Sequence, residues 1–367
     1  MIALPVGMVV GIIFLAAGTS GPHGVYWHSD GPSFLGVARN PFGSGHGFPG
    51  DPLAQGVAYR FGRVLLPLAG WILALGRTSR VPVMLAVAYV GSFVAMVALA
   101  AEHLRRAGRR PVLALGLLLL PFVLLWLFAI PTVIVEPLAI ALVLYAYLAD
   151  REERSTTRAR VAAAAAILAR ETMALAFLPL AWRAWRRDGR KGLMQWAATG
   201  VPYALWSCWV RLRVGSFPFL DPASNRRDAL AAPFVGWWQT LHRPFDNGQQ
   251  YGMLIAVVTI AFAIAVARRA QRNHAIAAAA LITSLSAIGY GWSVWQYPSE
   301  ALRVLGPAQV LLAVAALTTC RPSTTRDDDV DVDVSSVLDL RESSRTTPAS
   351  LVVDLTHFAT EDRAPAS

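Results

Sequence analysis

Charged residues are scarce in this chain of 367 residues: Asp, Glu, Lys and Arg make up 15% of it, whereas hydrophobic residues make up 55%. Soluble domains carry about a quarter charged residues. A soluble fold of this size would have too few polar side chains to cover so much apolar surface. The composition, with a mean hydropathy of +0.46, therefore predicts a membrane protein.

The chain also lacks the short segments of alternating polar and apolar residues that build membrane β-barrels. It has long runs of Leu, Ala and Val instead. Because an α-helix needs about 20 apolar residues to cross the bilayer core, we predict an all-α transmembrane bundle of roughly eight to ten spans. The clearest runs are Ile2–Gly18, Val81–Ala101, Pro111–Ile130, Val133–Ala149, Leu193–Val210, Tyr251–Ala267, Ala275–Trp292 and Val304–Thr319.

Residues typical of cofactor sites are few. The two cysteines, Cys208 and Cys320, lie in or beside apolar runs, so we interpret them as packing residues. No His/Cys cluster has the spacing of a metal site. No Walker-type or G-x-G-x-x-G phosphate-binding motif occurs either. We therefore expect no cofactor and no metal, and any activated donor should be delivered within the membrane rather than as a cytosolic nucleotide.

Acidic residues gather at the C-terminus. From Arg321 onward the chain has ten acids and five bases, a net charge of −5, so the remainder carries +15. In a membrane protein clustered Arg and Lys indicate topology, and not nucleic-acid binding. The positive-inside rule places the N-terminus, the tail and four basic stretches in the cytoplasm of a multi-pass plasma-membrane protein: His103–Arg110, Asp150–Arg160, Arg183–Lys191 and Arg268–Arg272.

Two apolar segments do not fit as simple spans. Val64–Gly76 is too short for a full crossing and would be an interfacial or re-entrant helix. Val161–Trp182 begins and ends beside basic stretches, so we predict a pair of short helices that turn near Arg170 and Glu171. The alternative is that the number of crossings is wrong by one.

Composition divides the chain into a transmembrane domain, residues 1–320, and a tail, residues 321–367. The tail is rich in Asp, Ser and Thr and has few large apolar residues, so we expect it to be disordered. Its acidic run, Asp327–Asp333, is either a binding segment for a basic protein partner or a solvated tail.

Polar residues predicted on the outer face are the functional candidates. A long outer loop, from Thr19 to about Gly62, contains His28, Asp30 and Asp51. A carboxylate just outside the membrane can act as a general base on a hydroxyl acceptor, although Asp30 also fits a turn, since Gly and Pro follow it. At the end of this loop, Arg60 and Arg63 suit either phosphate binding or interfacial snorkelling.

Five more charged residues lie within or beside apolar runs. Glu136 precedes a predicted span, and Arg170 and Glu171 interrupt an apolar stretch. Charges at such depth are costly unless they have a partner or a charged ligand. Glu300 and Arg303 open the last helix, and a helix N-terminus with an adjacent Arg is a favourable seat for phosphate.

At these residues the chain resembles the GT-C class of integral membrane glycosyltransferases, in particular its bacterial mannosyltransferase-like members, which use polyprenyl-phosphate-linked sugars. The segments that carry the resemblance are short and spread over about residues 1–320: Asp30, Tyr59–Pro67, Val135–Pro137, Ala169–Thr172 and Glu300–Arg303.

The resemblance implies transfer of a sugar, mannose or another hexose or pentose, from a polyprenyl-phosphate donor to a glycan or glycolipid of the cell envelope. It implies that Asp30 is the catalytic base. Arg60, Arg63, Arg170 and Arg303 would bind the donor phosphate, and the remaining residues would shape the site or hold the acceptor: His28, Asp51, Glu136, Glu171 and Glu300. Many members have two adjacent acids in the first outer loop, but here Gly31 follows Asp30, and Asp51 is the candidate replacement.

Two other functions remain open. A transporter or lipid flippase would use Arg170 and Glu171 to line a path, and an internal two-fold repeat would favour it. A non-catalytic scaffold would recruit partners through its tail. The long outer loops with Asp and Arg favour the glycosyltransferase.

Overall fold

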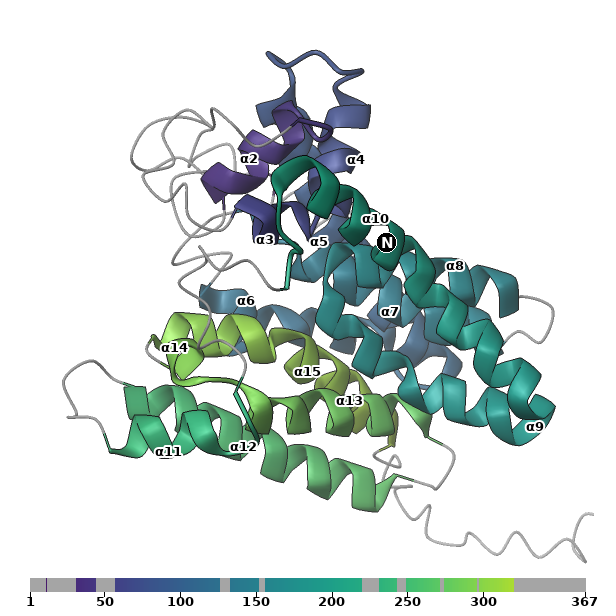
Figure 1. The fold of residues 1–367 in the computed structure, drawn as a ribbon. Helices are drawn as coiled ribbons and strands as arrows, with labels where there is room; N and C mark the ends of the chain where they lie inside the picture. The colour runs from purple at the N-terminus through teal and green to yellow at the C-terminus, as the bar shows by residue number, and fades with distance from the viewer. Residues whose placement is uncertain are drawn as a thin grey trace, which may run out of the picture. The chain divides into compact units, whose positions relative to one another are not determined.

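The structure, a computed structural model, describes residues 11, 31–43, 57–125, 133–151, 156–219, 231–242, 249–270, 274–295 and 297–319. These residues form α- and 3-10 helices and no strand, which confirms the all-α class (Figure 1). Residue contacts divide the chain into Met1–Cys320 and Arg321–Ser367. The second unit lies outside the described residues, as do His28, Asp30, Asp51 and, apart from Gly11, the first predicted span.

The helices of the first half are α2 (Gly31–Arg39), α3 (Val57–Phe61), α4 (Leu65–Leu73), α5 (Val81–Arg106), the 3-10 helix η1 (Pro111–Leu119), α6 (Pro121–Val123), α7 (Glu136–Arg151) and α8 (Thr156–Ala169). The second half has η4 (Glu171–Phe177), α9 (Leu178–Ala197), η5 (Ala198–Gly200), α10 (Val201–Val214), α11 (Val235–Leu241), α12 (Gln249–Arg269), α13 (Ala275–Leu285), η6 (Ser286–Gly289), α14 (Trp292–Trp295) and α15 (Pro298–Thr319).

Three of these helices, α5, α12 and α15, are long and apolar enough to cross a membrane. One side of α12 exposes large apolar side chains at intervals of three or four residues: Tyr251 is 67% exposed, Leu254 58%, Val258 58% and Phe262 51%. Water is a poor solvent for such a face, so lipid or another protein must cover it. The helices therefore support membrane association, whereas the number of spans stays a prediction.

The bounds of α5 follow from its terminal residues. Pro82 lies in the first turn, where its missing N–H costs no helical hydrogen bond. At the other end Gly108 has a positive φ of 71°. The N–H of Arg109 donates to the carbonyl of Leu104 at 2.8 Å, and that of Gly108 to Arg105 at 3.1 Å. This pair of bonds is a Schellman motif, which ends the helix beside its basic last turn.

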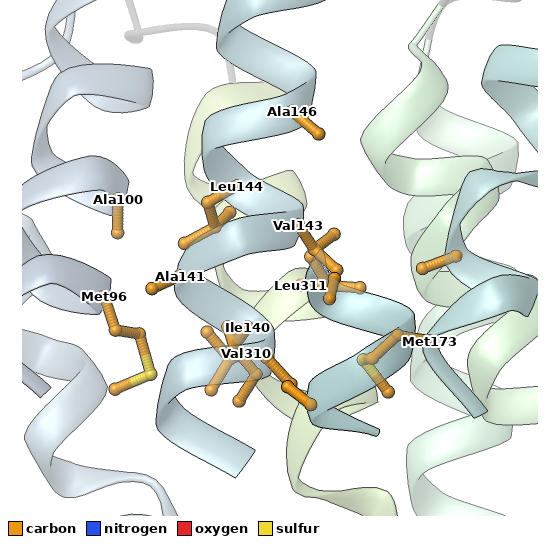
Figure 2. Close-up of a cluster of buried hydrophobic side chains, with 14 of the residues drawn as sticks. Met96, Ala100, Ile140, Ala141, Val143, Leu144, Ala146, Met173, Val310 and Leu311 are labelled. Atoms are coloured by element: carbon orange, nitrogen blue, oxygen red, sulfur yellow. The ribbon is translucent and has the colours of Figure 1, made fainter. Parts of the chain in front are cut away.

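Helix α7 lies at the centre of the main hydrophobic core. It packs against α5 and α8 and also contacts α15 and η4. Figure 2 shows its buried side chains between residues of α5 on one side and Met173 of η4 on the other, with Val310 and Leu311 of α15 drawn beside Ile140 and Val143. The labelled residues are Met96, Ala100, Ile140, Ala141, Val143, Leu144, Ala146, Met173, Val310 and Leu311. Helix α7 is therefore the element against which α5, α8, η4 and α15 all pack.

The run Pro111–Ile130, predicted to be a span, does not form one continuous α-helix in the described residues 111–125. They form the 3-10 helix η1, then an extended residue, Leu120, then α6. Leu120 has φ −65° and ψ 138° because the ring of Pro121 disfavours the α conformation of the preceding residue. Arg110, before Pro111, is extended for the same reason. Pro111 thus begins the apolar run, and Pro121 divides it.

The segments that the sequence places in outer loops contain short helices. The first of these loops contains α2 and α3, and the second, predicted over about Leu212–Gln250, contains α11. Helix α2 begins with Gly31 and Pro32, and proline is well tolerated in a first helical turn. Cys208 does not pack inside: it is exposed on α10, on the same side as Leu205 and Leu212, which are 66% and 84% exposed.

The predicted break near Arg170 and Glu171 is confirmed. Helix α8 ends at Ala169, and Arg170 is extended, with φ −156° and ψ 117°. Arg170 then pairs with Glu136 at the start of α7, while Arg183, further along, pairs with Asp150 at the end of α7. The chain therefore reverses at Arg170, so that η4 and the first part of α9 return along α7.

Two helical glycines offer a matched test of packing. A Cβ on Gly306 would lie 2.4 Å from the ring of Phe122, whereas one on Gly91 would meet nothing within 4 Å. We expect Gly306→Ala to lower the free energy of unfolding by about 1–3 kcal/mol, and Gly91→Ala to raise it by up to about 1 kcal/mol. Unfolding of the detergent-solubilised protein, followed by circular dichroism, measures both. Equal stability of the two variants would contradict the close approach of α15 and α6.

Candidate functional site

Among the predicted site residues that the structure describes, Glu136 is the most deeply buried carboxylate, with 1% of its surface exposed. It is the first residue of α7, where the helix dipole favours negative charge. Its Oε1 accepts a hydrogen bond from Nη1 of Arg170 and lies 3.8 Å from Nε of Arg303. Two guanidinium groups thus offset the cost of removing this carboxylate from water.

Arg170 is held in place by three elements. Besides Glu136 of α7, its Nε donates to Oγ1 of Thr172 at 3.0 Å, and its Nη1 to the carbonyl of Arg303 at 3.5 Å. Only 2% of Arg170 is exposed. No glycine or proline lies at this break in the helix, so we attribute the extended backbone to these contacts of the side chain.

Arg303 lies in the second turn of α15 and is also 2% exposed. Its Nη2 forms an ion pair of 2.7 Å with Oε2 of Glu300, one turn earlier in the helix. The Glu300 side chain is 27% exposed. The arginine is therefore buried, while one of its two carboxylate partners remains accessible.

Arg63 lies between α3 and α4 and repeats this arrangement with a second carboxylate. Its Nη2 is 3.2 Å from Oε1 of Glu171 and its Nε 3.5 Å from Oε2, so the contact involves both carboxylate oxygens. The Arg63 side chain is 6% exposed, and that of Glu171 is 29% exposed. The guanidinium carbon of Arg63 also lies 4.7 Å from the centre of the Tyr59 ring, and that of Arg60 lies 5.7 Å from it.

These contacts form one network, which we call the arginine–glutamate cluster. Glu136 joins Arg170 to Arg303, and Arg63 reaches Glu171, which is covalently adjacent to Arg170. The cluster combines six of the residues predicted from the sequence: Arg63, Glu136, Arg170, Glu171, Glu300 and Arg303. Its three arginines balance its three glutamates. An incoming anion would therefore have to displace a carboxylate, and only Glu171 and Glu300 are accessible.

The remaining predictions have different outcomes. Arg60 lies beside the cluster through Tyr59. His28, Asp30 and Asp51 lie outside the described residues. Helix α2, which begins directly after Asp30, packs against α3 and α4, the two helices that flank Arg63. Within the described part of the chain, no three His, Cys, Asp or Glu side chains are grouped as a metal site would require.

Sequence reasoning missed Tyr59 and Thr172. Tyr59 presents its ring to two arginines, and Thr172 accepts a hydrogen bond from Arg170. Both residues are within four positions of a predicted arginine, so the motifs contained them. The sequence does not show that the Tyr59 ring and the Thr172 hydroxyl contact these arginines, because the contacts depend on the path of the folded chain.

Comparison of the chain with models of known protein families, with curated proteins and with solved structures found no match.

Two glutamates that each pair with two arginines allow a controlled test of the cluster. Glu136→Gln would leave Arg170 and Arg303 buried without their shared carboxylate, so we expect it to lower the free energy of unfolding by about 3–5 kcal/mol. Glu102 pairs with Arg105 and Arg106 at 2.6 and 2.7 Å, but at an exposed helix end. Glu102→Gln should cost less than about 1 kcal/mol.

Denaturant unfolding of the purified protein in detergent measures both changes. If Glu136→Gln proves no more destabilising than Glu102→Gln, the buried ion pairs do not hold α7, α15 and the Arg170 turn together.

Proposed function

We propose that this chain is a multi-pass membrane glycosyltransferase of the GT-C type, which transfers a sugar from a polyprenyl-phosphate donor to a cell-envelope glycan or glycolipid. The observation that carries the proposal is the arginine–glutamate cluster. Residues chosen for their likeness to that class contact one another although they are far apart in the sequence, as Arg63 and Glu171 are, at a separation of 108 positions. Three apolar helices support a membrane location.

The cluster has the chemistry that binding of a donor phosphate requires. Guanidinium groups match phosphate bidentately, and Arg63 already makes a two-oxygen contact with a carboxylate. A phosphate that takes the place of Glu171 or Glu300 would exchange one anion for another and keep the buried arginines neutralised. We therefore interpret these two accessible glutamates as groups that occupy the phosphate position until the donor binds.

In the proposed reaction the arginines and Asp30 have separate roles. The acceptor oxygen forms a bond to the anomeric carbon, and the bond from that carbon to the phosphate oxygen breaks, with its electron pair going to the departing polyprenyl phosphate. Arginines fixed before the reaction would stabilise this developing charge. Asp30 would take the proton of the acceptor hydroxyl. In the sequence Asp30 directly precedes α2, a helix that packs against α3 and α4.

Transport of a lipid-linked substrate is the second candidate. The break at Arg170 supports it, because interrupted helices with charged groups are typical of transporter binding sites. The sugar-transfer assay below separates the two functions, since a flippase moves the donor across the bilayer without breaking its phosphate–sugar bond.

Asp30→Asn tests the catalytic base. The purified chain, supplied with polyprenyl-phosphate mannose and other lipid-linked hexoses and pentoses together with membrane glycolipids, should transfer labelled sugar. The variant should lower kcat by about 100-fold or more, because a general base contributes at least that factor. Asp188→Asn is the control, since Asp188 is exposed and pairs with the neighbouring Arg187.

A normal kcat for Asp30→Asn would refute the role of Asp30. If the wild-type protein transfers no sugar from any donor, but moves a lipid-linked sugar across the membrane of proteoliposomes, the chain is a transporter.

Glu300→Gln tests the exchange of anions. Removing the charge that competes for Arg303 should lower the KM for the donor several-fold, while kcat changes little. Initial rates at varied donor concentration measure both quantities, with Glu102→Gln as the control. A higher KM in Glu300→Gln would mean that Glu300 orients Arg303 and does not hold the place of the phosphate.

A further inference from the structure

A wide groove lies at the end of α7 opposite the arginine–glutamate cluster. It has a volume of about 1400 Å³ and is bounded by the C-terminal residues of α7, the first part of α9 and the beginning of α13. Asp150, in its wall, is 14 residues along α7 from Glu136, which corresponds to about 21 Å. None of the residues predicted from the sequence to bind a substrate lines this groove. We call it the basic groove.

Positive charge dominates its walls. Four arginines line it, Arg151, Arg183, Arg186 and Arg187, but only one acid, Asp150, which pairs with Arg183. Arg187 pairs with Asp188 outside the lining, and Arg186 lies 5.8 Å from the ring centre of Trp182.

Neighbouring cations affect the pKa of Arg151. Partial burial, followed by the charges of Arg183 and Arg106, lowers the pKa of Arg151. Burial and the charge of Arg151 likewise lower the pKa of His274, so its ring is neutral at neutral pH. The arginines therefore supply the surplus positive charge of the groove, and a bound anion would relieve their mutual repulsion.

The same part of α9 exposes large apolar side chains. Leu178 is 49% exposed, Trp182 55% and Trp185 41%, and the two tryptophan rings lie 4.6 Å apart. Trp beside Arg is the composition of helices that lie in the interface between lipid and water. The inner wall of the groove is apolar, with Leu180 and Ala184 buried and Ala278 and Ile282 opposite. A ligand that fits these surfaces has an anionic headgroup and hydrocarbon chains.

We infer that the basic groove binds an anionic phospholipid, with its phosphate held by Arg151, Arg186 and Arg187 and its chains against Leu178 and Trp182. Basic pockets between membrane helices bind such headgroups elsewhere. Free phosphate would use the arginines but leave the exposed tryptophans without a role. This site is independent of the proposed sugar transfer: it lies at the other end of α7 and its occupancy requires no reaction.

Native mass spectrometry of the full chain in detergent tests the inference. The wild-type protein should retain phosphatidylglycerol in preference to phosphatidylcholine with the same acyl chains. Replacing Arg151, Arg186 and Arg187 by Gln should weaken phosphatidylglycerol binding by roughly tenfold or more, since each such cation contributes about 1 kcal/mol near an anionic lipid surface. The control replaces three exposed cations that do not line the groove, Arg190, Lys191 and Arg269, by Gln.

Three results would overturn the inference. They are equal retention of the two lipids by the wild-type protein, equal loss of phosphatidylglycerol in the two triple variants, and complete displacement of the lipid by inorganic phosphate. The comparison of lipids uses only the unsubstituted chain, so it decides the question even if a variant folds poorly. None of these results depends on glycosyl transfer, and a chain without transferase activity should still retain the lipid.

Discussion

One carboxylate, that of Glu136, determines much of the arrangement described above. Buried in the first turn of α7, it contacts Arg170 from the break after α8 and Arg303 from α15. Each charge alone would be costly to remove from water, and together they require one another. The reversal of the chain at Arg170 and the N-terminal part of α15 therefore meet at this carboxylate.

The two ends of α7 consequently have different electrostatic characters. At Glu136 the three arginines and three glutamates of the cluster balance in charge, and Glu171 and Glu300 are its accessible glutamates. At Asp150 more arginines than acids line the basic groove, so an anion can bind there without displacing a carboxylate. The balanced charges at Glu136 fit the proposed exchange of a substrate anion. The excess of arginines in the basic groove fits the proposed retention of a lipid.

Prediction from the sequence succeeded for features that depend on residues close together in the chain. Apolar runs located α5, α12 and α15, and the charged pair within an apolar stretch located the break at Arg170. It did not anticipate the backbone of residues 111–125, where the run contains a 3-10 helix and an extended Leu120 before Pro121. Hydropathy measures affinity for lipid and carries no information about backbone hydrogen bonds.

By itself, the sequence determined that the chain is helical and apolar, and which charged residues lie at unusual depth. The tertiary structure alone decided which arginine meets which glutamate. Arg170 and Glu136 are separated by 34 residues, and Arg63 and Glu171 by 108. No local rule relates such distant positions, because their pairing follows from how α5, α7, α8 and α15 pack. The basic groove has the same origin, since α7, α9 and α13 each supply one of its walls.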